Sequence, residues 1–177
     1  MEAALTLGFF RGTSASTFSP EKTLTRAEMV TVLHRMAGTP EVETENPFRD
    51  VAPDRWYTDA ITWAAANGIV QGKTADRFDP NAPVTREQIA SILYRYATFC
   101  GYAVTASAEI SRFADAGIVG SYALAAMKWA SAEGLINGSG SKLDPKGSAT
   151  RAQVAAILAR FCKNIAGAST PASKPVS

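Results

Sequence analysis

The chain has 177 residues, of which 46% are hydrophobic and 19% charged. This composition is typical of globular proteins and excludes a chain that is disordered over its whole length. Its formal net charge of +2 comes from basic residues spread along the chain, unlike the dense basic face of a nucleic-acid-binding protein. No apolar run approaches the roughly 20 residues that cross a bilayer, so we expect neither a membrane span nor a nucleic-acid partner.

Three segments of the chain align with one another and define a repeat. Equivalent positions carry the same residue types, namely a first glycine (Gly8, Gly68, Gly134), a second glycine (Gly12, Gly72, Gly138) and a proline (Pro20, Pro80, Pro145). We place repeat one at residues 1–39, repeat two at 48–101 and repeat three at 113–165. Residues 166–177 are expected to form a disordered tail, since they have almost nothing to bury.

Repeats two and three open with a shared stretch that contains the first helix of each repeat. These helices are predicted from about Tyr57 to Asn67 and from about Tyr122 to Glu133, and each is ended by a glycine. Repeat one lacks this opening, because the chain starts inside what should be its first helix. We therefore expect the groove that uses this helix to be incomplete unless another chain supplies the missing part or the natural protein is longer.

The loop after each first helix is rich in glycine and proline, a composition typical of turns. Gly72 and Gly138 recur there, and we count both among the candidate ligand-binding residues.

The second helix of each repeat begins at a threonine that opens a capping box, at Thr25–Glu28, Thr85–Gln88 and Thr150–Gln153. An apolar stripe at helical spacing follows each box. A single helix pair cannot bury such a stripe alone, whereas three pairs packed together can. The sequence therefore predicts an all-α fold of three helix-loop-helix repeats in a compact pseudo-threefold bundle.

An arginine follows each capping threonine, at Arg26, Arg86 and Arg151. Free backbone N–H groups at a helix N-terminus attract anions, so a cation there costs a few tenths of a kcal/mol unless something compensates. Two interpretations stay open. Each arginine forms an ion pair with a neighbouring repeat, for example with Asp50 or Asp115, or it binds a ligand carboxylate in a bidentate contact that lysine could not make. A second recurring set is assigned to solvation of the helix flank or to inter-repeat pairing: Arg35, Arg95 and Arg160.

The aromatic residues of the first helices fall into two groups. Trp63 and Trp129 lie within the helices, and we interpret them as packing residues. Trp56 and its counterpart Tyr122 lie at the helix entrance, where an amphipathic ring either stacks on the apolar face of a sugar or caps the core.

Catalytic and metal-binding constellations are not evident in the sequence. His34, the only histidine, is expected to be exposed on a helix, and no nucleophile recurs beside a base. The acidic segment Asp76–Asn81 lacks the ligand spacing of a calcium loop. Cys100 and Cys162 do not occupy equivalent positions, and their spacing alone fixes no bridge between them. We therefore predict a protein that is not an enzyme and that has no cofactor and no metal.

The repeat resembles the S-layer homology family. The resemblance rests on the F-x-D-V…W-Y-x-D-A-I opening, the G-I-V-x-G stretch and the T-R-A-E helix start, and it covers Gly8 to about Ile165. It implies a three-pronged helical domain outside the cell, in the bacterial cell wall or S-layer, that binds secondary cell-wall polysaccharide, typically pyruvylated. Ligand is then expected in the grooves between repeats, with the arginine of each T-R motif facing the acid and the threonine beside it (Arg26, Arg86, Arg151, Thr25, Thr85, Thr150).

The resemblance makes non-covalent anchoring to an acidic wall polysaccharide the leading function. The alternatives are a self-assembling structural module that binds other protein chains and a module that binds peptidoglycan. A homo-oligomer that completes the first repeat is the protein partner to test. Gln88 and Gln153 stand where the family has Glu, which retains the cap but removes any ligand role of that carboxylate.

Overall fold

The computed structural model describes residues 19–167, and the regular structure in this range consists of helices only, as predicted. The elements in chain order are α2 (Arg26–Met36), α3 (Thr58–Ala66), α4 (Arg86–Phe99), the 3-10 turns η1 (Ala116–Ile118) and η2 (Ser121–Ala123), α5 (Leu124–Ala132), α6 (Arg151–Phe161) and the π-helical turn η3 (Cys162–Ala166). The predicted first helix of repeat one, with Gly8 and Gly12, and the tail from residue 168 lie outside the described residues. None of the described helices is long and apolar enough to cross a membrane.

All three predicted capping boxes are present. The hydroxyl of Thr25 accepts the amide of Glu28 at 3.2 Å, and the carboxylate of Glu28 accepts the amide of Thr25 at 2.8 Å. The same reciprocal bonds open the other two second helices, at Thr85–Gln88 and Thr150–Gln153. Local sequence thus decides where α2, α4 and α6 begin.

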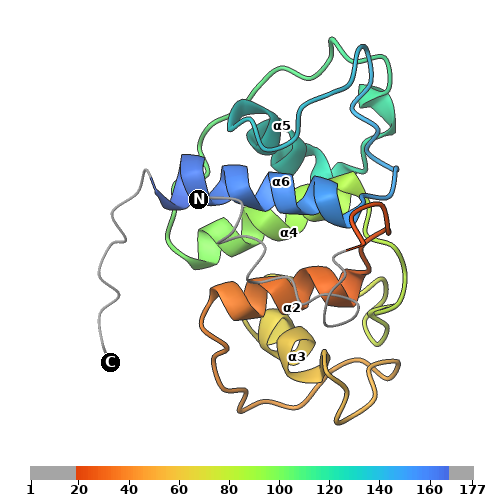
Figure 1. The fold of residues 1–177 in the computed structure, drawn as a ribbon, viewed down its shortest axis with the longest axis vertical. Helices are drawn as coiled ribbons and strands as arrows, with labels where there is room; N and C mark the ends of the chain where they lie inside the picture. Colours follow the sequence, from red (N-terminus) through yellow and green to blue (C-terminus); the bar gives the residue numbers. More distant parts are fainter. Residues whose placement is uncertain (1–18, 168–177) are drawn as a thin grey trace.

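The helices pair across the boundaries between repeats. Helix α2 of repeat one packs against α3 of repeat two, and α4 of repeat two packs against α5 of repeat three. Figure 1 shows α2, α4 and α6 across the middle of the molecule, with α3 and α5 toward opposite ends of the view. Each packed pair is thus built from two consecutive repeats.

This pairing corrects the expectation that His34 is exposed. The His34 side chain is buried, its ring lies 5.1 Å from that of Trp63, and its Nε2 lies 2.9 Å from the Pro40 carbonyl oxygen. The side of α2 that looked polar is covered by the first helix of the next repeat. The equivalent contact in the second pair joins Tyr94 and Trp129, with ring centroids 5.5 Å apart.

A ring of backbone hydrogen bonds lies where the three repeats meet. The amide of Leu24 donates to Ala149, the amide of Ala149 to Val84, and the amide of Val84 to Leu24, at 2.9, 3.2 and 2.9 Å. All three residues are fully buried. One bond from each repeat to the next closes the ring, and this closure gives the bundle its pseudo-threefold axis.

Candidate functional site

The starts of the second helices are used by neighbouring repeats. The amides of Arg26 and Ala27 donate to carbonyls of repeat two, Ala82 at 2.9 Å and Pro80 at 3.0 Å. The corresponding amides of α4 donate to repeat three, and those of α6 to repeat one. Because the third amide of each helix is taken by the capping threonine, the free N–H groups expected from the sequence are already satisfied. Anion binding at these positions must come from side chains.

The arginine side chains also cross to the next repeat. Arg26 donates from Nε to the Phe78 carbonyl at 2.9 Å and from Nη2 to the Gln71 carbonyl at 3.3 Å, and its guanidinium lies 4.5 Å from the centroid of the Phe78 ring. Arg86 makes the equivalent bonds to repeat three, to Leu143 at 2.9 Å and Asn137 at 3.1 Å. The contact to a neighbouring repeat is therefore real, but these two guanidiniums bind carbonyl oxygens instead of the carboxylates of Asp50 or Asp115.

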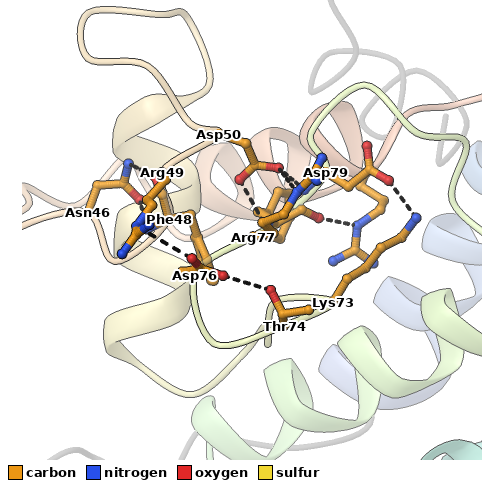
Figure 2. Close-up of polar contacts among 11 residues, drawn as sticks. Asn46, Phe48, Arg49, Asp50, Lys73, Thr74, Asp76, Arg77 and Asp79 are labelled. Atoms are coloured by element: carbon orange, nitrogen blue, oxygen red, sulfur yellow. Dashed lines mark hydrogen bonds and ion pairs between the residues drawn. The ribbon is translucent and has the colours of Figure 1, made fainter.

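Those two aspartates hold the loops onto which the arginines dock. Asp50 accepts the amides of Phe78 and Asp79 at 2.8 and 2.7 Å, inside a polar network that also joins Asp79 to Lys73 (Figure 2). Asp115 accepts the equivalent amides in repeat three. Burial raises the pKa of Asp50, but the backbone amides outweigh it and hold the pKa below its ordinary value. The carbonyl oxygens that receive the arginines are fixed by this bonding.

Groove one lies between repeats one and two and has a volume of about 260 Å³. It is lined by Arg26 from α2, by Gly72 and Lys73 from the loop of repeat two, by Gln88 and Arg95 from α4, and by Tyr122 from repeat three. No acidic residue is among the described residues that line it. The groove therefore carries three cationic side chains, of which Lys73 is paired with Asp79 beside the groove while Arg26 and Arg95 form no ion pair with a described carboxylate.

Groove two is the equivalent space between repeats two and three, with a volume of about 200 Å³. Arg86 and Arg160 line it together with Asn137 and Gln153. Burial and the charge of Arg160 lower the pKa of Arg86, against an opposing effect of Asp144. Like groove one, it holds two arginines and no acidic residue among its described lining.

Arg95 and Arg160 line the two grooves, a position that the sequence interpretation did not give them. Each arginine lies seven residues after the glutamine of its own capping box, and this spacing places the arginine and the glutamine on the same face of their helix. Their recurrence was visible in the sequence, but only the structure shows that this face borders a groove.

Arg151 differs from the other two arginines in its partner. It is as buried as Arg26, with 3% against 5% of the residue exposed, but its Nη1 lies 2.9 Å from the carboxylate of Glu28 in repeat one. Glu28 stands where grooves one and two have glutamine, so Arg151 pairs with a carboxylate, whereas the described partners of Arg26 and Arg86 are carbonyl oxygens. The loop of repeat one that would border this third groove lies outside the described residues.

The glycines and threonines predicted to bind ligand have structural roles in the fold. Gly72 and Gly138 stand where a side chain has no room. A Cβ atom at Gly72 would lie 2.2 Å from the Thr74 carbonyl oxygen and 2.7 Å from the Phe48 ring, and one at Gly138 would lie 2.3 Å from the Phe113 ring. The capping threonines line neither groove, and a ligand role for Thr25, Thr85 and Thr150 stays a prediction.

The two entrance aromatics behave differently. Tyr122 lines groove one and is half exposed. Trp56 is 61% exposed and packs edge-on against Tyr57, with centroids 5.0 Å apart, outside the linings of grooves one and two.

The acidic segment and the cysteines show no metal site. Asp76 accepts a hydrogen bond from Thr74 and pairs with Arg49 (Figure 2). Within residues 19–167 no group of three histidine, cysteine or acidic side chains could hold a metal ion. Cys100 and Cys162 are present as thiols.

Comparison with known proteins shows one family for this chain. The family model for the S-layer homology domain matches residues 1–30, 47–90 and 112–155, more than half of the chain. The Surface-layer 125 kDa protein of Lysinibacillus sphaericus is 32% identical over 169 residues, which is 93% of this chain and 14% of that protein. An Endoglucanase of Bacillus sp. (strain KSM-635) is 31% identical, over 88% of this chain and 16% of the relative. Exoglucanase XynX of Acetivibrio thermocellus is 34% identical, over 83% of this chain and 14% of the relative. The chain thus spans less than a fifth of the length of each of these relatives.

Proposed function

Because the chain belongs to the S-layer homology domain family, we propose that it is a non-catalytic module that anchors a protein at the bacterial cell surface by binding an acidic cell-wall polysaccharide. The matched segment is shared by a surface-layer protein and by two proteins named as glucanases. A segment common to proteins with such different names does not supply the activity named in any one of them, and anchoring at the cell surface is a property that all three could use.

The observation that carries the proposal is the charge of groove one. Arg26 and Arg95 line a single groove that has no carboxylate in its described lining, and the third cation, Lys73, is paired with Asp79 at its edge. Burial lowers the pKa of both arginines, because removing a guanidinium from water disfavours its charged form. An anion in the groove would compensate for this lost hydration, since charges attract more strongly where water is partly excluded.

A carboxylate attached to a sugar suits this groove. Two of the five N–H donors of Arg26 are used on the Gln71 and Phe78 carbonyls, so the planar head is oriented before a ligand arrives. The family resemblance suggests a pyruvate ketal on a polysaccharide as that carboxylate.

Two similar grooves on one module favour a polymeric ligand. Grooves one and two each contain a pair of arginines and are related by the repeat. When one groove holds a polysaccharide chain, the other meets the same chain at a high effective concentration, so weak individual sites add up to firm retention.

Binding of the isolated chain to purified wall polysaccharide, with and without its pyruvate, tests the proposal. Arg95→Ala in groove one and Arg160→Ala in groove two should each weaken binding roughly tenfold, the loss of one charge-assisted contact. Arg49→Ala is the matched control, because Arg49 is an exposed arginine that pairs with Asp76 away from both grooves. Circular dichroism should show that all three variants stay folded.

Three results would contradict the proposal. Equal binding to polymer with and without pyruvate would show that the arginines do not bind a pyruvate carboxylate. Binding to bare peptidoglycan, with no binding to the polysaccharide, would identify peptidoglycan as the ligand. Concentration-dependent self-association, with no binding to either polymer, would identify a structural self-assembling module instead.

A further inference from the structure

We infer that Glu87 is a positioning residue for ligand recognition in groove one, where it fixes the ring of Tyr122 as a wall on which a sugar ring stacks. The inference rests on the proposed function and adds to it a second contact surface. Groove one would then recognise the acid through its arginines and the sugar ring through an aromatic face.

Tyr122 is held in place on two sides. Its hydroxyl donates to Glu87 Oε1 at 3.0 Å. Its ring lies against Gly120, where an added Cβ atom would come within 2.7 Å of the Tyr122 Cε1 atom. The tyrosine is nevertheless 53% exposed and lines groove one. It therefore presents an aromatic surface to the groove without being free to rotate away.

Glu87 is fully engaged in holding repeat three. Its side chain is 4% exposed and accepts three donors: the Gly120 amide at 2.9 Å, the Tyr122 hydroxyl at 3.0 Å and the Lys146 ammonium at 2.6 Å. A buried carboxylate is costly unless its oxygens are satisfied in this way. All three donors come from repeat three, so Glu87 connects the α4 start to the segment that carries Tyr122.

The helix start itself does not require this residue. Ala27 and Ala152 occupy the position of Glu87 in repeats one and three. Both of those helices still begin with a complete capping box. Of the three repeats, only repeat two has a buried carboxylate at this position. This carboxylate contacts Tyr122, an aromatic residue that lines groove one. The positioning of Tyr122 accounts for this difference.

Tyr122 stands beside the cations of the same groove. The positive charges of Arg26 and Arg95 act on its hydroxyl and oppose the rise in its pKa that burial and Glu87 cause. A sugar whose acid lies between the arginines would place its ring near this wall. Aromatic rings stack well on the apolar faces of sugars. The wall should therefore favour a sugar acid over a small free acid of the same charge.

The test compares Glu87→Ala, Glu87→Gln, Tyr122→Ala and the double variant Glu87→Ala/Tyr122→Ala, with pyruvylated wall polysaccharide as probe in calorimetry. Glu87→Ala should weaken binding roughly tenfold, as loss of an ordered aromatic contact predicts. Glu87→Gln should weaken binding less than Glu87→Ala, because its amide oxygen still accepts the tyrosine hydroxyl although its NH2 group no longer accepts the Gly120 amide. In the Tyr122→Ala background, Glu87→Ala should cause no further loss.

Ionisation of Tyr122 gives a second readout, followed over the pH range in which circular dichroism shows the variant to be folded. Burial, the hydrogen bond to Glu87 and its negative charge raise the pKa of Tyr122 to about 12. Without Glu87 this pKa should fall toward the ordinary tyrosine value of about 10. The ultraviolet absorbance of tyrosinate between these two pH values should therefore rise in Glu87→Ala and stay native-like in Tyr122→Ala.

The outcomes separate the inference from the proposed function. Native binding by Glu87→Ala, with loss of binding by Arg95→Ala, overturns the inference and leaves the function standing. A loss in Glu87→Ala that persists in the Tyr122→Ala background also overturns it, because Glu87 would then act by another route. If Arg95→Ala and Glu87→Ala both bind like the native chain, the proposed function is wrong and the inference falls with it.

Discussion

The carboxylate of Asp50 shows how a residue outside a groove controls one inside it. It accepts the amides of Phe78 and Asp79, and the carbonyl of Phe78 in turn accepts Nε of Arg26. Both oxygens of the carboxylate are occupied by amides from the same loop (Figure 2). A change at Asp50 should therefore move the surface on which Arg26 rests.

Asp50→Asn should lower stability in a pH-dependent way. The folded-state pKa of Asp50 is lowered, so its charged form stabilises the fold above the unfolded-state pKa of about 4, and that contribution is lost as the pH falls through the folded-state pKa. Asparagine offers one acceptor and points a donor at an amide, so the variant should be less stable by about 1 kcal/mol at neutral pH. Urea unfolding at neutral pH and in acid measures the difference. A difference that stays constant into acid would contradict this account.

At the scale of the helix, the capping boxes contribute stability that can be measured one element at a time. Thr85→Ala removes the acceptor for the Gln88 amide at the start of α4 and should cost about 1 kcal/mol in the free energy of unfolding. Thr85→Ser keeps the hydroxyl and should restore most of this stability. Denaturant titration of the two variants against the native chain measures both effects. Equal stability of the alanine and serine variants would show that the cap is not used.

Helix starts could be predicted from the sequence because a capping box is local, whereas helix partners could not. The apolar stripe of α2 shows that one face is buried, but it does not show that α3 of the next repeat covers it. The error at His34 has this origin, since the residue is buried by Trp63 from another repeat. The position of Arg95 in groove one could not be predicted for the same reason. Its recurrence lies in the sequence, but its neighbours Arg26 and Tyr122 come from repeats one and three.

At the scale of the whole molecule, the ring of bonds at the axis couples the three repeats. Leu24 is fully buried, and its backbone bonds to repeats two and three. Leu24→Ala should therefore destabilise the whole domain, by about 2–5 kcal/mol, while unfolding remains a single transition. Calorimetry checks the single transition, and hydrogen exchange should release the amides of Leu24, Val84 and Ala149 together. Separate melting of one repeat would show that the ring does not couple them.

The closed ring also bears on how such a protein can change its number of copies. In an open-ended solenoid each unit contacts only its neighbours, and gene duplication can lengthen the array one unit at a time. Here each repeat donates one backbone hydrogen bond at the axis and accepts one. No repeat therefore has a free edge to which a fourth copy could add. A chain with two copies would leave a buried donor and acceptor unpaired. Duplication of this gene segment should therefore be tolerated in sets of three, each set forming a ring of its own.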